Sequence, residues 1–272
     1  MMQRRRLAAE LRRLRGISSK TLEEVADHLE CSPAKISRIE NNQVALRIQD
    51  ARELLDLYRV TADDRETLLQ MVRAARRKGW WSPFGDLLDE SMENLLSLEE
   101  DAAAIRIYNN SVVSPLLQTA DYTRVFLQSW TDHEADIERR TELFQERQHI
   151  LSNDAPLMSI VLDEAALRRP VGGPDVMRGQ LNRIVAECDR PLVEVRVIPF
   201  TKGPYQAMGF PFQIFEFTND PRVVYVEMFE GGRMIETADE VGRYVAAFDQ
   251  VWARAWDPAR SRDFLKELLE SC

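Results

Sequence analysis

The chain has 272 residues, 44% hydrophobic and 30% charged, with 45 acidic side chains against 36 basic ones and three cysteines. At roughly 150 residues per domain, this length predicts about two domains of ordinary globular composition. No stretch approaches the ~18 apolar residues of a membrane span, and the basic start alternates leucine with arginine, which argues against a signal peptide. The widely spaced Cys31, Cys188 and Cys272 favour a reducing compartment and argue against disulfides and a zinc site.

The net charge of −9 is unevenly divided along the chain. Residues 1–80 carry 17 basic and 12 acidic side chains, a net of +5, whereas residues 81–272 carry 19 basic and 33 acidic ones, a net of −14. This asymmetry predicts a small basic module that meets a polyanion, joined to an acidic module with another role.

Three short helices are predicted within the first 40 residues. The basic first segment carries leucines at helical spacing: Leu7, Leu11 and Leu14. Thr21 is a predicted N-cap, and Glu24 stands three residues on, as in a capping box. Ser32 is a predicted cap for the third helix, with Pro33 at the first helical position. Because only three residues separate the second helix from the third, we predict a helix-turn-helix.

The run TLEEVAxxLxxSxxKISRIEN over residues 21–41 resembles the Xre/Cro-repressor family of DNA-binding domains. The resemblance covers about 60 residues and implies that the third helix enters the major groove, with its first residues at the base edges. The base-facing residues it implies are Pro33, Ala34, Ser37 and Arg38. The guanidinium of Arg38 can bond guanine O6 and N7 together, and a phosphate contact is the alternative for this residue.

Other residues of the resemblance are expected to position the domain. Those placed to hold the DNA backbone are Thr21, Ser32, Lys35 and Asn42. Arg15 and Glu40 stand where this family commonly pairs an arginine of the first helix with a glutamate of the third. We therefore expect a structural ion pair there, not two DNA contacts.

Three positions depart from the family pattern. Leu22 replaces a glutamine that would hold the DNA backbone, so we expect an altered phosphate clamp. Glu30 replaces the glycine of the turn, so it either adopts a positive φ at some cost or the turn is different. Asn42 replaces a glycine after the third helix, and asparagine tolerates the left-handed conformation better than most residues.

Two further helices, over Ile48 to Tyr58 and Asp63 to Arg77, are predicted to complete a five-helix bundle. Gly79 ends the last of them, and the domain boundaries follow: residues 1–79 as the helix-turn-helix domain, 80–96 as a linker or docking segment, and 97–272 as a regulatory domain. Trp80 and Trp81 are expected to act as a docking anchor, with a ligand stack as the alternative.

The second module is predicted to be α+β. Residues 97–152 have a helical pattern, with one stripe formed by Leu98, Ala102, Ile105 and Tyr108. Strand-like runs follow at residues 157–163, 192–200, 210–217 and 222–229, with a short fifth at 233–237. Helices are predicted at 175–188, 238–255 and 258–269. Turns between the last three runs favour antiparallel pairing, so we predict a mostly antiparallel sheet of four to five strands flanked by helices.

Several runs of this module resemble an uncharacterised domain that follows the Xre-type helix-turn-helix in many actinobacterial regulators. They are RKGWW at 77–81, LLQTADY at 116–122, RQ at 147–148, LDEAALR at 162–168 and VYVE at 224–227. The resemblance implies a sensing role, often for a small partner protein. Because Ser114-Pro115 stands where Pro-Gly is usual, the loop before the second run is expected to differ.

The residues of this module provide few catalytic candidates. His28, His133 and His149 form no metal-binding spacing, so we predict no metal, no cofactor and no enzyme activity. Arg147 and Gln148 are candidates for binding a carboxylate of a partner, with an internal salt bridge as the alternative for Arg147. The carboxylates Asp163, Glu164 and Glu227 are expected to be solvated, although a catalytic pair is the alternative.

The sequence therefore predicts a cytoplasmic, nucleoid-associated and homodimeric transcriptional regulator that binds a double-stranded DNA operator. Its acidic domain is predicted to dimerise and to sense a small partner protein or a small-molecule effector, with no membrane involved. Two alternatives remain: an interaction module with secondary DNA binding, and a small-molecule receptor or enzyme in the C-terminal half.

Overall fold

The computed structural model describes residues 2–41, 44, 46–75, 79–152 and 155–271. The chain divides into two compact units, Met1–Ser82 and Pro83–Cys272, which we call unit 1 and unit 2. Each unit has its own hydrophobic core. No helix of the described residues is long and apolar enough to cross a membrane.

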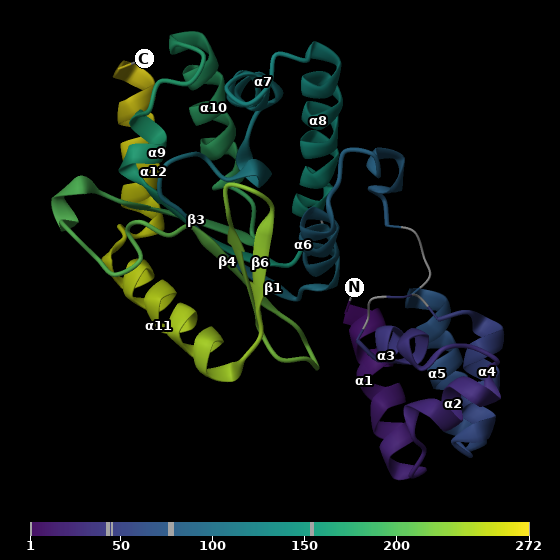
Figure 1. Ribbon diagram of the computed structural model, residues 1–272. Helices are drawn as coiled ribbons and strands as arrows, with labels where there is room; N and C mark the ends of the chain where they lie inside the picture. Colours follow the sequence, from purple (N-terminus) through teal and green to yellow (C-terminus); the bar gives the residue numbers. More distant parts are fainter. Residues whose placement is uncertain (1, 42–43, 45, 76–78, 153–154, 272) are drawn as a thin grey trace. The chain divides into compact units, whose positions relative to one another are not determined.

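Unit 1 is helical, as the sequence predicts. Its helices are α1 (Met2–Ile17), α2 (Leu22–His28), α3 (Pro33–Glu40), α4 (Ile48–Leu57) and α5 (Ala62–Ala75). Helix α1 packs against α3 and α5, and α2 packs against α3 (Figure 1). The predicted turn between α2 and α3 is present.

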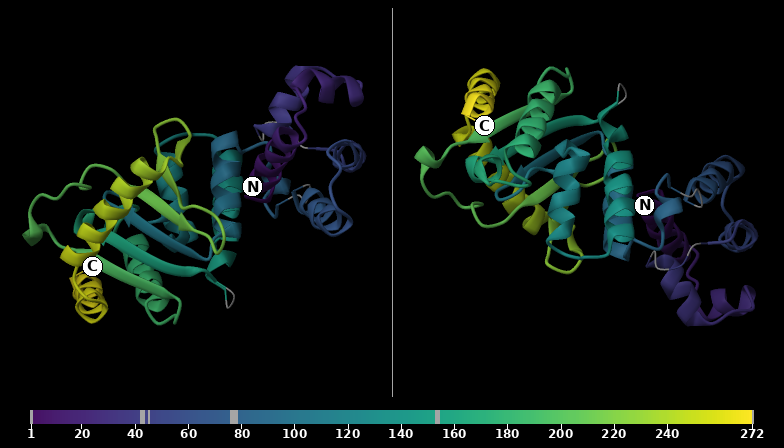
Figure 2. Two further views of the ribbon diagram at one scale, coloured as in Figure 1. Left: turned by 90° about the horizontal axis from the view of Figure 1, so that it is seen from below. Right: turned by 90° about the horizontal axis from the view of Figure 1, so that it is seen from above.

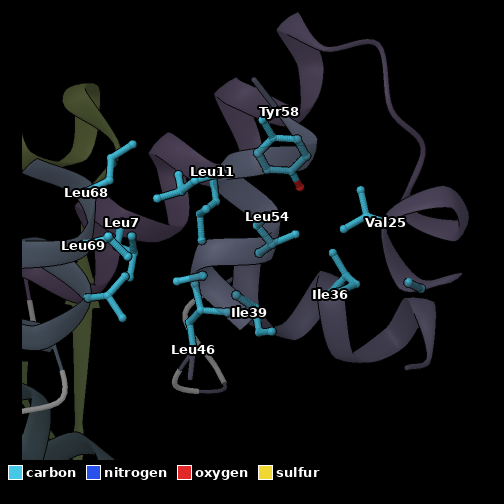
Figure 3. Close-up of a cluster of buried hydrophobic side chains, with 14 residues drawn as sticks. Leu7, Leu11, Val25, Ile36, Ile39, Leu46, Leu54, Tyr58, Leu68 and Leu69 are labelled. Carbon is cyan, nitrogen blue, oxygen red and sulfur yellow. The ribbon is translucent and has the colours of Figure 1, made fainter. Parts of the chain in front are cut away.

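The core of unit 1 draws apolar side chains from all five helices (Figure 3). Val25 and Ile36, from the two helices beside the turn, are at most 1% exposed, and they lie near Leu54 of α4. Leu11 and Leu68 bring in α1 and α5. A buried Val, Leu or Ile side chain contributes about 1.5–3 kcal/mol relative to an exposed one, so this cluster fixes how α2 and α3 lie.

Unit 2 contains one six-stranded sheet with the strand order β3-β2-β1-β4-β5-β6. The strands are β1 (Ala104–Asn109), β2 (Leu157–Asp163), β3 (Val193–Ile198), β4 (Phe212–Glu216), β5 (Val223–Glu227) and β6 (Gly232–Ile235). The α+β class predicted for this half is confirmed.

The sheet is mixed, so the prediction of a mostly antiparallel sheet of four to five strands is wrong. The pairs β1–β2 and β2–β3 are parallel, and β1–β4, β4–β5 and β5–β6 are antiparallel. As predicted, turns join the last three strands, β4, β5 and β6, as antiparallel pairs. The first three are parallel because helices cross over between them, as parallel neighbours require.

The strand missed by sequence analysis is β1, which lies at the centre of the sheet. Ile105 and Tyr108 were expected to continue a helical stripe, but α6 ends at Asp101 and β1 begins at Ala104. The alternation of Ile105, Arg106 and Ile107 suits a strand equally well, and a six-residue run fits both periods. Pairing with β2 on one side and β4 on the other decides between them.

Helices cover both faces of the sheet (Figures 1 and 2). One face packs on α11 (Ala238–Arg254), where Phe248 and Val251 meet Tyr108 and Phe212 of the strands. The helices of the opposite layer are α6 (Glu90–Asp101), α7 (Ala120–Gln128), α8 (Glu134–Arg147) and α10 (Pro174–Glu187). Short helical segments connect these elements: η1 (Ser82–Phe84), η2 (Pro115–Leu117), η3 (Gln148–Leu151), α9 (Glu164–Arg168) and η4 (Phe200–Lys202).

The last helix, α12 (Pro258–Ser271), covers the β3 edge of the sheet. Ser261, which is fully buried, accepts a hydrogen bond from the backbone N–H of Val197 at 3.0 Å. The N–H of Trp256 donates to the Val197 carbonyl at 2.9 Å. Because an open strand edge would pair with another chain, these bonds protect one end of the sheet.

Candidate functional site

The residues at the start of α3 stabilise the beginning of the helix. The Ser32 hydroxyl accepts a hydrogen bond from the Lys35 N–H at 3.2 Å, and Pro33 occupies the first turn. Ile36 and Ile39 face the core, at 1% and 4% exposure. The side chains on the opposite side of the helix are thereby turned toward solvent, whereas Glu40 at its end is buried.

The solvent-facing side of α3 contains the predicted base-facing residues. Pro33, Ala34 and Arg38 are exposed, and Ser37 is half-buried. Three of these four residues, Pro33, Ala34 and Ser37, have small side chains, which allow a close approach to DNA. The Arg38 guanidinium makes one long hydrogen bond, from Nε to the Ala34 carbonyl at 3.4 Å, and it can leave this bond to meet a partner.

Thr21 and Lys35 are engaged inside unit 1. Thr21 caps α2: its hydroxyl accepts from the Glu24 N–H at 3.1 Å, and its own N–H donates to the Glu24 carboxylate at 2.9 Å. The Lys35 ammonium lies 3.1 Å from a carboxylate oxygen of Asp50 in α4. A phosphate contact by Lys35 therefore has to compete with Asp50. Asn42, the remaining predicted backbone contact, lies outside the described residues.

Arg15 of α1 and Glu40 of α3 form a bidentate ion pair. The Arg15 Nε and Nη2 atoms donate to the two carboxylate oxygens at 2.7 and 2.9 Å, and Nη1 donates to the Lys20 carbonyl at 3.1 Å. Glu40 is buried, and its hydrogen bonds raise the pKa of Arg15 above the usual arginine value. Arg12 extends the link by donating to the Asn41 side chain, a contact that sequence analysis missed.

The sequence allowed either a positive φ at Glu30 or a different turn, and the structure has the positive φ. Glu30 has φ +48°, in the left-handed region that favours glycine. Its N–H bonds to the Asp27 carbonyl at 3.2 Å, and the Cys31 N–H bonds to the Ala26 carbonyl at 2.9 Å. This pattern is a Schellman motif, which usually has glycine at the left-handed position.

Replacing Glu30 with glycine is expected to stabilise unit 1 by about 0.5–1 kcal/mol, because glycine adopts a positive φ without a clashing Cβ. In a unit of this size the melting temperature should rise by roughly 3–6 °C. Thermal unfolding followed by circular dichroism measures it. Glu30→Ala is the control: it removes the same charge but keeps Cβ, and an equal rise in that variant would contradict the explanation.

The tryptophan pair at the end of unit 1 is packed against itself. The rings of Trp80 and Trp81 lie edge to face, with centroids 5.8 Å apart and an interplanar angle of 88°. Both side chains are half-buried. Gly79 makes this arrangement possible, because a Cβ at that position would lie 2.4 Å from the Trp81 ring. The docking role of the pair stays a prediction.

In unit 2, Arg147 lies inside the protein and is 2% exposed. Its Nε and Nη2 atoms donate to the two carboxylate oxygens of Glu99 on α6, at 2.8 and 2.6 Å. A partner at the surface does not reach Arg147 in this conformation. The neighbouring Gln148 donates to the carbonyls of Pro115 and Gln118 at 3.0 and 2.6 Å, and accepts from Arg183.

Glutamines that sequence analysis did not single out hold the loop after β1. Gln180 of α10 is fully buried and bonds both the Thr119 N–H and the Leu117 carbonyl, at 2.8 and 2.7 Å. The Gln118 amide donates to the Val113 carbonyl at 2.8 Å. With Gln148, these side chains join α8 and α10 to the chain between residues 113 and 119. Leu117 and Thr119 belong to the LLQTADY run, but their partner Gln180 lies far along the sequence, so the run alone does not reveal these contacts.

Two of the three carboxylates, Asp163 and Glu164, lie at the end of the parallel strand β2 and are each 7% exposed, so the expectation that they are solvated is wrong for these two. The Tyr205 hydroxyl donates to Asp163, and it also lies 2.7 Å from the Tyr108 hydroxyl. Glu164 accepts from the Phe200 N–H at 2.9 Å and pairs with Arg168. Glu227, at the end of β5, is exposed. No group of three or more His, Cys, Asp or Glu in the described part of the chain is placed to hold a metal ion.

Comparison with protein families assigns both parts of the chain. Residues 92–267 match the family described as "Domain of unknown function (DUF5753)". The chain belongs to the DUF5753 family. Residues 6–68 match a family described as "Helix-turn-helix domain", so the chain carries this domain at its N-terminus. Neither the curated proteins nor the solved structures gave a match.

The DUF5753 region contains the whole sheet, together with the Arg147–Glu99 pair and the glutamines around the loop after β1. The helix-turn-helix match contains α2 and α3 and the Arg15–Glu40 pair.

Proposed function

We propose that this DUF5753 protein is a sequence-specific transcriptional regulator of the Xre/Cro type that binds operator DNA through α3. The observation that carries the proposal is the exposed side of α3, which lies within the helix-turn-helix match. There the long side chain of Arg38 stands beside the small residues Ala34 and Ser37. An α-helix with such a side fits the major groove. The net charge of +5 over residues 1–80 supplies attraction to DNA phosphates.

In this proposal the protein acts as a homodimer, cytoplasmic and associated with the nucleoid. Dimers of helix-turn-helix proteins read two half-sites about 34 Å apart. The acidic DUF5753 unit dimerises and binds a small partner protein or a small-molecule effector, without catalysing a reaction. An effector changes DNA affinity only if it binds one dimer geometry better than the other.

The DNA-binding part is tested by selecting duplexes from a random library with the full chain. The expected result is enrichment of a two-fold symmetric site, with an affinity that falls steeply as salt is raised because phosphate contacts release counterions. Recovery of unrelated sequences with equal affinity would contradict sequence-specific binding.

Arg38→Ala is expected to weaken binding to the selected site by about 1–3 kcal/mol and to relax the preference at one base pair of each half-site. The reason is the loss of the two bonds from the guanidinium to guanine O6 and N7. Fluorescence anisotropy on the selected site and its single-base variants measures both effects. The control is Arg73→Ala, an exposed arginine of α5 paired with Glu66. An equal loss on all sequences would make Arg38 a phosphate contact instead.

A further inference from the structure

The sheet of unit 2 reverses its strand order at β1. The chain leaves β1 to build β2 and then β3 on one side, and afterwards places β4 on the other side of β1. In open α/β sheets, ligands bind at such a reversal, outside the carboxyl ends of the strands. Since β5 is two antiparallel steps from β1, both strands point the same way. The ends of β1, β2, β3 and β5 therefore share one edge, which we call the carboxyl edge.

Two buried amides lie beside each other at this edge, each with a carbonyl oxygen that has no hydrogen-bond partner among the described residues. They are Asn109, the last residue of β1, and Gln213 of β4, each 6% exposed. Ile107 is paired with Gln213 in the ladder, so Asn109 and Gln213 point to the same face as diagonal neighbours, about 7–8 Å apart. A buried acceptor without a donor costs free energy, and a ligand that donates would recover it.

The loop that leaves β1 adds a third polar atom of this kind. The Ser114 side chain is 1% exposed, and its hydroxyl has no partner within the described ranges. The unpartnered atoms at the β1–β4 boundary thus include two carbonyl oxygens, which can only accept. Their common requirement is a partner that carries N–H or O–H groups.

Glu227 brings negative charge to the same face. Tyr225 is paired with Gln213 in the ladder, so Glu227, two residues further along β5, points to the same face at the carboxyl edge. Its side chain is exposed to water, and its charged neighbours are Arg147 and Glu99, which have opposite charges. Arg147 also serves Glu99, so the three side chains together carry one more negative than positive charge.

Exposed apolar side chains surround this edge. In the described part of unit 2, all of the large exposed ones except Leu157 lie in segments around the carboxyl edge: Trp130, Phe200, Met208, Phe210, Met228 and Phe229. Trp130, after α7, stacks on Phe229 of the β5–β6 turn with ring centroids 5.8 Å apart. These two rings are 57% and 85% exposed, so they provide an aromatic surface joining the helix layer to the sheet.

We propose that the carboxyl edge at the β1–β4 boundary binds a small cationic molecule with an aromatic or apolar body. Its N–H groups donate to the side-chain carbonyls of Asn109 and Gln213, its positive charge faces Glu227, and its body lies against Trp130 and Phe229. The proposal names a chemical class of effector for the sensing role proposed above. Only the regulatory consequence of binding rests on that role.

The test uses the full chain and two probes with the same ring and opposite charge, benzamidine and benzoate, in the absence of DNA. Ligand-observed NMR is expected to give a dissociation constant near ~1 mM for benzamidine, and binding of benzoate at least about tenfold weaker. Glu227→Gln should weaken benzamidine roughly tenfold while leaving its ring contacts. Glu194→Gln on β3, an acidic side chain paired with Arg196, is the matched control and should bind as the wild type does.

A second variant separates binding from folding. Gln213→Leu removes an unpartnered buried oxygen, so it should abolish benzamidine binding while the melting temperature stays the same or rises. The proposal is overturned if benzamidine fails to bind at about 10 mM, if it binds no better than benzoate, or if both variants bind it as tightly as the wild type does. Because DNA selection is measured without a probe, failure of this site and failure of DNA binding are distinguishable.

Discussion

Replacing Arg147 with methionine is expected to lower the free energy of unfolding of unit 2 by about 3–5 kcal/mol. Glu99 and Arg147 have side chains only 4% and 1% exposed, and both guanidinium bonds to the carboxylate are short. Without Arg147 the Glu99 carboxylate stays buried with no compensating charge. That desolvation cost, more than the lost attraction, produces the effect. Hydrogen exchange of the amides in α6 and α8 measures the loss within unit 2, which matters because a chain of two units need not unfold in one step.

The double variant Glu99→Leu/Arg147→Met is the decisive control. Replacing both charges with apolar side chains of similar size is often neutral or stabilising, by about 1–4 kcal/mol, because neither ion then has to be desolvated. Stability near that of the wild type is therefore expected. If the single Arg147→Met variant lost less than about 1 kcal/mol, the pair would contribute no more than an exposed salt bridge.

Local features of unit 1 were predictable because their partners are close in sequence. The capping box joins Thr21 to Glu24, and the Ser32 cap acts within one turn. Each motif needs no information from the rest of the chain. The positive φ of Glu30 was predictable as one of two options, because the absence of glycine there does not by itself decide whether the turn changes.

Unit 2 was less predictable because its decisive contacts join distant residues. Strand β1 is fixed by β2 and β4, which begin about 50 and 110 residues later, and its six residues fit a helix as well as a strand. Arg147 finds Glu99 48 residues away, among the many acidic side chains of an acidic unit. The proximity of Asn109 and Gln213 depends on the β1–β4 register, which no local pattern encodes.

The second large effect concerns unit 1. Replacing Arg15 with leucine is expected to lower its free energy of unfolding by about 3 kcal/mol, at the lower end for a broken buried pair. Glu40 has a side chain only 4% exposed and would keep its charge without the bidentate partner, while Arg12, at 3.9 Å, compensates in part. The loss also removes a bond from Arg15 to the Lys20 carbonyl, which ties the end of α1 to the start of α2. Chemical denaturation followed through hydrogen exchange of α1 and α3 amides measures the change.

Arg15→Lys distinguishes charge from geometry in the same pair. Lysine keeps the positive charge but cannot form two parallel bonds and a third to a carbonyl, so we expect a loss between that of Arg15→Leu and the wild type. Since Glu40 ends α3, both variants should weaken DNA binding without changing which bases are preferred, because they loosen the helix but leave Arg38 in place. A change in base preference equal to that of Arg38→Ala would instead make Arg15 a direct contact to DNA. A loss of stability in Arg15→Lys as large as in Arg15→Leu would show that the geometry of the pair, and not its charge, holds α1 to α3.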